Sequence, residues 1–249
     1  MSRIRRLVHR GRIGMAVALA GLATGCAELG IDPALVEELL QIRGAGLSES
    51  QIASGLKEAL KVGTERTVTR TARQGGFLDN PLVRIVLPDE LAEIADRLRS
   101  IHLGGPADEL EVAMNRAAER ASAEAKTIFW DAVTSMTIQD AVRILNGPDD
   151  AATVYFRSRT EDALRSRFSP VVSAAMEQVG LYRAYDELVT RSRVLSLFAD
   201  PTVELNRYVT DEALDGLFTI LREEEQRIRR DPAARTTELL RQVFGGLGG

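Results

Sequence analysis

The fold class is decided by the stretch ADELEVAMNRAAERA, residues 107–121. Successive residues of an α-helix are turned by about 100° around its axis. At that angle one side of the helix is apolar and is formed by Leu110, Ala113, Met114, Ala117 and Ala121. Another side is polar and is formed by Asp108, Glu111, Asn115 and Glu119. The pattern predicts an amphipathic core helix whose polar side faces water.

On both sides of this stretch, glycines and prolines separate segments with helical periodicity. Capping boxes at Ser48 and Thr137 mark two helix starts, and Thr210 is a third expected N-cap. We expect helices at 33–43, 49–70, 89–101, 107–121, 123–135, 138–146, from Pro148 onward, and at 161–168, 171–179, 182–198, 211–230 and 232–244. The sequence therefore predicts an all-α, bundle-like single domain of about ten helices.

One segment does not fit a helix. The run LVRIVL, residues 82–87, lies between two prolines and has strand-like composition. A single run of this length cannot form a sheet, so we expect a short extended segment near 82–87.

Glycines inside two of the expected helices predict close packing. Gly55, Ala59 and Gly63 are spaced by four residues and so share one side of a helix. Because glycine lowers helix stability, this pattern indicates a close crossing with another helix. Gly216 lies in the middle of a helix and indicates either close packing or space left for a ligand.

The chain has 249 residues, 45% of them hydrophobic, which fits one globular domain. Residues 1–25 contain five arginines and no acidic residue, and without them 27 basic and 36 acidic residues remain, a net charge of −9. Nucleic-acid binding depends on Lys and Arg charge, so this balance argues against a nucleic-acid partner.

The first 25 residues have the pattern of a signal peptide. A basic segment is followed by the apolar run IGMAVALAGLA, residues 13–23, which is too short to span a membrane. The run ends in LATGC, residues 22–26, which resembles the lipobox of bacterial lipoproteins. This resemblance implies that Cys26 is acylated and becomes the new N-terminus. Ala27 is not the Asp that marks inner-membrane retention, so we expect the outer membrane.

We divide the chain into four parts: a lipoprotein signal peptide at 1–25, a tether with a first short helix at 26–46, a helical domain at 47–245 and a tail at 246–249. The expected protein is attached to the outer membrane through its lipid and faces the periplasm. Possible further partners are an envelope protein or an apolar ligand held between helices.

Several stretches resemble one bacterial family, the domain of unknown function numbered 4197. They are GLKEAL at 55–60, Gly76-Phe77, DELEVAMNRAAE at 108–119, DDAATVYF at 149–156, and YVTDEALDGLF at 208–218 followed by the acids 223–225. The resemblance runs from about Leu47 to Phe244 and implies a helical exported protein, often with a lipoprotein leader. It implies no activity and no catalytic residues.

The sequence holds no standard catalytic signature: HExxH, P-loop, GxSxG and EF-hand patterns are all missing. Cys26 is the sole cysteine, and His102 is the sole histidine after the leader. We expect His102 to end a helix before Gly104. No cofactor and no metal site are predicted.

Carboxylates are the remaining candidates for chemistry. Glu225 falls on the apolar side of its helix, where an acid must be paired because an unpaired buried charge is costly. We expect either an ion pair, for instance with Arg116, or a polar cavity; Glu223 and Glu224 are expected in water. Candidate polar-site residues are Asp149, Asp150, Thr153, Tyr155, Asn115, Arg116, Asp211, Asp215 and Glu225.

Three functions stay open. The favoured one is a non-catalytic binding or envelope-associated lipoprotein. The second is a hydrolase or metal-dependent enzyme that uses paired acids among Asp149, Asp150, Asp211, Asp215 and Glu225. The third is a purely structural lipoprotein.

Overall fold

The computed structural model describes residues 48–178, 183 and 201–231, and these residues form helices and connecting turns without any strand. Contacts divide the chain into two units, Met1–Gly46 and Leu47–Gly249, and every described residue belongs to the second unit. The expected leader, Cys26, the first short helix, most of the helix at 182–198 and the helix at 232–244 lie outside the described residues.

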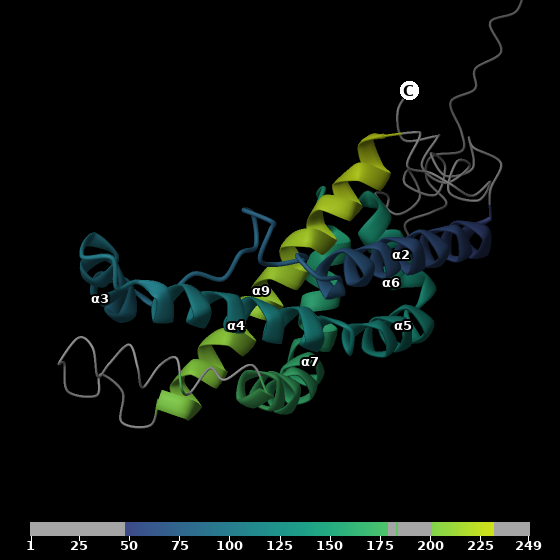
Figure 1. The fold of residues 1–249 in the computed structure, drawn as a ribbon. Helices are drawn as coiled ribbons and strands as arrows, with labels where there is room; N and C mark the ends of the chain where they lie inside the picture. The colour runs from purple at the N-terminus through teal and green to yellow at the C-terminus, as the bar shows by residue number, and fades with distance from the viewer. Residues whose placement is uncertain (1–47, 179–182, 184–200, 232–249) are drawn as a thin grey trace, which may run out of the picture. The chain divides into compact units, whose positions relative to one another are not determined.

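The helices of the described part are α2 (Glu49–Ala72), α3 (Asp89–Ser100), α4 (Gly105–Ser122), α5 (Ala125–Ser135), α6 (Ile138–Asn146), α7 (Ala151–Gln178) and α9 (Pro201–Arg230). The all-α class is confirmed, and the expected number of about ten helices is not. Figure 1 shows the long helix α9 running across α2, α4 and α7.

The core lies where α5, α7 and α9 meet. Phe129, Phe156 and Phe218 are fully buried there, one from each helix. The ring of Phe129 meets the other two edge to face, with centroid distances of 5.3 and 6.1 Å. Such aromatic contacts stabilise a core beyond the area that they bury.

Both predicted capping boxes are confirmed. The Ser48 hydroxyl accepts the Gln51 amide, and the Gln51 side chain accepts the Ser48 amide at 2.9 Å. Thr137 and Asp140 form the same reciprocal pair at the start of α6. These hydrogen bonds satisfy amides that the first turn of a helix leaves without partners.

The structure corrects two expected helix boundaries. The helices expected from Pro148 onward, at 161–168 and at 171–179 form a single helix, α7, which continues through Pro170. The side chains of Phe168 and Val172 are fully buried on either side of the proline, so core packing outweighs the lost backbone hydrogen bond. Helix α9 begins at Pro201 and Thr210 lies inside it, so the expected helix start at Thr210 is wrong.

Gly216 is a packing residue, as one of the two predictions for it states. A Cβ at this position would lie 2.5 Å from Cε1 of Phe77 and 3.2 Å from Cβ of Val83. The helix α9 therefore needs glycine here to admit the segment that follows α2. At Gly63 a Cβ would lie 3.5 Å from Cδ1 of Ile228, an ordinary contact. Helix α2 does pack on α9, but, contrary to the prediction from the spacing, this crossing is not close enough to require glycine at position 63.

Candidate functional site

Three of the four residues on the polar side of α4 are buried, which corrects the prediction that this side faces water; only Asp108 is exposed. Glu111 is 9% exposed, Glu119 4% and Asn115 not at all. The residues after α2 cover this side, because the extended segment 82–87 places Val83, Ile85 and Leu87 in the core. The alternation of buried and exposed side chains from Val83 to Leu87 fits the expected extended segment, but Leu82 and Val83 lie in a turn and no strand forms. The backbone of residues 84–87 therefore needs polar partners.

Asn115 supplies those partners at Ile85. Its side-chain oxygen accepts the Ile85 amide at 2.9 Å, and its side-chain nitrogen donates to the Ile85 carbonyl at 2.7 Å. The same nitrogen also donates to the carbonyl of Glu111 at 2.8 Å. One amide side chain therefore bonds the segment as a neighbouring strand would, and Asn115 has no spare group for a ligand.

Glu119 holds the start of the same connection one helical turn later. Its Oε1 accepts the amides of Phe77 and Leu78 at 3.2 and 3.3 Å. Its Oε2 accepts Nη1 of Arg116 at 2.7 Å. Arg116 is therefore the partner of Glu119, and the predicted pairing of Arg116 with Glu225 is wrong.

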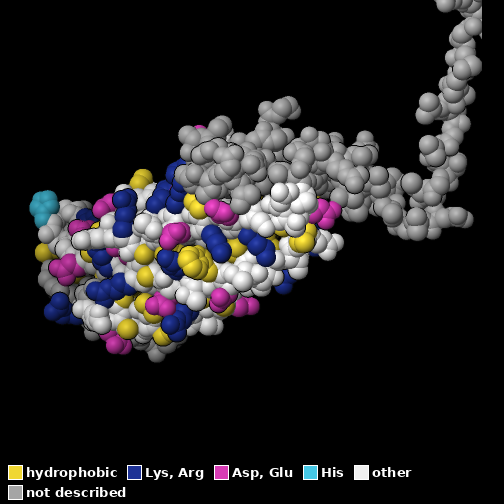
Figure 2. Space-filling model, turned by 90° about the vertical axis from the view of Figure 1, so that its right-hand side faces the viewer, with side chains coloured by type: hydrophobic (Ala, Val, Ile, Leu, Met, Phe, Trp, Pro, Cys, Tyr) yellow, Lys and Arg dark blue, Asp and Glu magenta, His cyan; other side chains and the backbone are white. Residues whose placement is uncertain are grey.

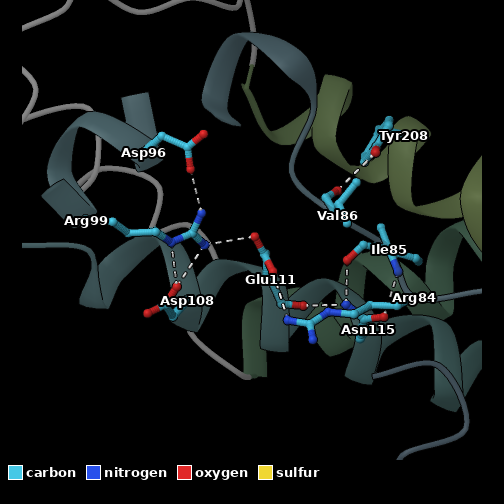
Figure 3. A network of polar contacts seen from close by, with 9 residues as sticks. All are labelled: Arg84, Ile85, Val86, Asp96, Arg99, Asp108, Glu111, Asn115 and Tyr208. Carbon is cyan, nitrogen blue, oxygen red and sulfur yellow. Dashed lines mark hydrogen bonds and ion pairs between the residues drawn. The ribbon is translucent and has the colours of Figure 1, made fainter. Parts of the chain in front are cut away.

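Figure 3 shows the charged network beyond Asn115, in which Arg99 points toward three carboxylates. Arg99 donates to Asp96 at 3.2 Å, to Asp108 at 2.8 Å and to Glu111 at 3.0 Å. Arg84 donates to the other oxygen of Glu111 at 3.0 Å. The hydrogen bonds that Arg99 donates to Asp108 and Glu111 raise the pKa of Arg99. The network links α3, α4 and the extended segment.

Tyr208 closes the network from α9. Its hydroxyl donates to the Val86 carbonyl at 3.0 Å. Burial, with smaller contributions from Glu212 and Asp89, raises the pKa of Tyr208 to about 12. The phenol therefore stays protonated at neutral pH and acts as a fixed donor.

Glu225 is buried and bonds the first turn of α7. Its two oxygens accept the amides of Ala152 at 2.9 Å and Thr153 at 2.8 Å, and the Thr153 hydroxyl donates to it at 2.8 Å. The acid thus compensates the positive end of a helix dipole from a helix far along the chain. Its role as an N-cap for α7 is structural.

The ion-pair partner of Glu225 is Arg229, one turn later on α9, at 3.0 Å. Arg229 also donates to the carbonyls of Ile144 at 2.7 Å and Leu145 at 3.3 Å, at the end of α6. One buried ion pair therefore completes two helix ends, the negative end of α6 and the positive end of α7. The expected pairing of Glu225 is confirmed, with a different arginine.

Glu224 corrects a second prediction, because its side chain is fully buried rather than in water. Arg70 of α2 donates to it at 2.7 Å and to Glu223 at 2.9 Å, and Arg227 donates to Glu224 at 3.2 Å. The apolar stripe of α9 alone could not reveal this burial, because the covering helix is distant in sequence.

The other candidate acids lie in separate ion pairs. Asp211 pairs with Arg165, Asp215 with Arg157 at 2.7 Å, and Asp149 with Arg230. The hydrogen bond from Arg230 lowers the pKa of Asp149. Asp150 lies in the turn before α7. Across the described ranges, no group of three or more His, Cys, Asp or Glu side chains could hold a metal ion.

Two further predicted residues have structural surroundings. Tyr155 is half-buried and packs edge to face on Phe156, with centroids 5.9 Å apart. Burial, and then Asp140, raises its pKa. His102 ends α3 in the left-handed region with φ of 62°, and its amide and that of Leu103 bond Arg99 and Leu98 carbonyls. The predicted helix-ending role of His102 is confirmed.

These packed helices lie within the part of the chain that matches a known protein family. The model of a family described as "Protein of unknown function (DUF4197)" matches residues 46–245. The chain belongs to this family. The resemblance seen in the sequence is therefore confirmed. Comparisons with curated proteins and with solved structures find no significant match.

In this DUF4197 member, an open cleft of about 480 Å³ lies beside α4. Its lining mixes charged and small apolar side chains: Asp108, Glu109, Val112, Ala113, Arg116 and Arg183. The cleft is open to solvent, whereas a pocket for a small hydrophobic ligand encloses most of the surface of that ligand.

One face of the described part of the DUF4197 domain shows how surface hydrophobic residues are distributed. On the face drawn in Figure 2, hydrophobic side chains form small groups between charged ones. Among residues 48–178 and 201–231, a search for helices with the length and apolarity to cross a membrane finds none.

Proposed function

We propose that this DUF4197 protein is an outer-membrane lipoprotein, anchored through Cys26, whose helical domain acts by binding rather than catalysis. The anchor is supported by the basic leader, the short apolar run and the lipobox-like LATGC at residues 22–26. The sole cysteine of the chain stands where acylation requires it.

The non-catalytic part of the proposal is supported by the structural contacts of the candidate polar groups. Glu225 caps one helix, Asn115 bonds an extended segment, and Glu119 bonds two backbone amides. Asp149, Asp211 and Asp215 lie in three different arginine pairs. An acid-base or metal site needs such groups to converge on one point, and these groups instead hold separate elements together.

Membrane fractionation tests the anchor. In the native chain, we expect metabolic labelling of Cys26 with a palmitate analogue and recovery of the protein in outer membranes. The change Cys26→Ser should abolish labelling and release the protein from the membrane fraction. Ala27→Asp is the matched control: it should keep the label and shift the protein to the inner membrane. Unchanged labelling of Cys26→Ser would refute the lipoprotein.

Native mass spectrometry tests the binding role. The chain from residue 27 onward is purified under gentle conditions, and its mass is compared with that of the bare polypeptide. A reproducible added mass from lipid or from a partner supports a binding protein. Bound divalent metal would contradict the non-catalytic proposal if it depended on the candidate acids. In that case Asp211→Asn with Asp215→Asn would abolish metal binding, and the control Asp96→Asn, at an exposed position, would not.

A further inference from the structure

The lysines of this chain are unusually placed. The sequence contains 29 arginines but only three lysines, Lys57, Lys61 and Lys126, and one tryptophan, Trp130. All three lysines lie on α2 or α5, the two helices that pack beside Trp130. The ion pairs of the candidate site, by contrast, are all made by arginines.

The four residues form an antiparallel seam between α2 and α5, which we call the lysine–tryptophan seam. Lys57 donates to the Thr134 carbonyl at 3.3 Å. One turn along α2, the ammonium of Lys61 lies 5.8 Å from the centre of the Trp130 ring. Lys126, one turn before Trp130 on α5, lies 5.1 Å from the same ring and 3.1 Å from Glu65.

The seam faces outward. Trp130 is 40% exposed, and the side chains of Lys126 and Glu65 are 47% and 55% exposed. A tryptophan usually buries its large ring, so keeping the sole tryptophan at the surface has a cost. Stacked lysines hold the ring in place through cation–π attraction, which leaves indole and ammonium groups together in water.

We propose that the lysine–tryptophan seam rests on a bilayer surface that contains anionic phospholipid. The inference rests on the proposed lipid anchor and adds an orientation to it. Indole rings favour the headgroup region, and lysines near a membrane are attracted to anionic lipid by about 1 kcal/mol each. A lysine ammonium on its flexible stem can exchange a protein contact for a phosphate.

Charge around the seam makes the anchor necessary. Glu58, Glu65 and Asp131 lie on the same two helices, and the chain without residues 1–25 has a net charge of −9. The seam alone therefore attracts a membrane weakly. A tether raises the effective concentration of the seam at the membrane surface. Once the domain is tethered, even this weak attraction is enough to orient the seam toward the lipid.

The tether is long enough for this contact. Cys26 precedes the described residues by 22 positions, a stretch that can span at most about 75 Å. Lys57 lies eight residues into α2, about 12 Å along its axis. The seam can reach the bilayer from an acylated Cys26.

Trp130 provides the measurement, because it is the only tryptophan in the chain. The chain from Cys26 to Gly249 is coupled through its sole thiol to a maleimide lipid in vesicles. This coupling replaces natural acylation, so the outcome is independent of whether cells modify Cys26. Vesicles of phosphatidylcholine are compared with vesicles of phosphatidylcholine and phosphatidylglycerol in equal parts.

In the anionic vesicles we expect a blue shift of Trp130 emission and a fall in acrylamide quenching by about half, since the indole enters the headgroup region. High salt should reverse both changes, because it screens the lysines. Neutral vesicles should leave the spectrum as it is without lipid.

Two double variants distinguish the contribution of the seam from that of positive charge elsewhere on the domain. Lys57→Gln with Lys61→Gln should remove the difference between the two vesicles. Arg97→Gln with Arg207→Gln removes equal charge at exposed positions of α3 and α9 and should leave the difference intact. Circular dichroism checks that each variant is folded. Equal spectra in both vesicles, or equal loss in both double variants, would overturn the proposal.

Discussion

At the scale of single residues, two glycines that both lie inside helices differ in the space around them. Gly216 faces the Phe77 ring at a distance where no Cβ fits, whereas Gly63 has an ordinary contact with Ile228. Both lie inside long helices. The space around each Cα therefore decides what its substitution does.

We expect Gly216→Ala to lower the free energy of unfolding by about 1–3 kcal/mol, because overpacking forces Phe77 to move. Gly63→Ala should raise it by about 0.5–1 kcal/mol, because alanine favours the helix. Chemical denaturation of both variants measures these changes. If both variants changed the free energy of unfolding by the same amount in the same direction, α9 would have space for a methyl group beside the segment that follows α2.

Tyr208 carries a prediction about pH. Its pKa is raised from 10.0 to about 12 in the folded chain, chiefly by burial. A group whose pKa rises on folding adds stability that is complete below pH 10 and disappears as the pH rises toward 12. At neutral pH, Tyr208→Phe should cost about 1 kcal/mol through the lost hydrogen bond to Val86.

The measurement is denaturant unfolding of the native chain and of Tyr208→Phe at neutral pH and at steps through the alkaline range. The stability difference should be constant below pH 10 and should shrink as the pH approaches 12. Tyr155→Phe serves as a second case on another helix, since burial also raises the pKa of Tyr155. A difference that does not change with pH would contradict the raised pKa.

At the scale of elements, one ion pair joins three helices. Glu225 and Arg229 of α9 complete the start of α7 and the end of α6. Their side chains are 5% and 10% exposed. A buried charge that loses its partner is costly, so the pair should respond to mutation as a unit.

Glu225→Leu should destabilise the protein by about 3–5 kcal/mol, since it removes the carboxylate that neutralises Arg229 and leaves the amides of Ala152 and Thr153 without this acceptor. Adding Arg229→Met should cost less than the sum of the single changes, with a coupling of about 1–3 kcal/mol. The exposed pair Glu93 and Arg97, 3.7 Å apart, should show coupling near zero. A double-mutant cycle on each pair measures this, and additive effects at Glu225 and Arg229 would count against the bridge.

The sequence reveals local features of these elements and misses the contacts between them. Capping boxes at Ser48 and Thr137 are set by residues three apart, so they are visible in the sequence. The burial of Glu224 on α9 and of Asn115 and Glu119 on α4 depends on chain segments far away. Periodicity also put Glu225 inside the domain correctly, but it could not choose Arg229 over Arg116, because both lie within helices that carry many charges.

At the scale of the whole molecule, the contacts separate Leu47–Gly249 from the residues before it. The helical domain should therefore fold by itself. Helix α2 packs on α4, α5, α6 and α9, so the boundary cannot lie within it.

A chain that begins at Leu47 should unfold in one cooperative step, at the same temperature as a chain that begins at Ala27. A chain that begins at Arg73, after α2, should not fold, because α4, α5, α6 and α9 lose a shared partner. Thermal unfolding followed by circular dichroism compares the three. A lower midpoint for the chain from Leu47 would mean that residues before it add to the core.

Helix α9 lies near the end of the given sequence and completes elements that precede it. Its Glu224 pairs with Arg70, and its Glu225 caps α7. Its Gly216 admits Phe77. A growing chain that still lacks α9 leaves all three arrangements incomplete, and contacts over such sequence distances form slowly. Folding thus waits for the last fifth of synthesis, which keeps the chain unfolded and able to be translocated during the export proposed for it.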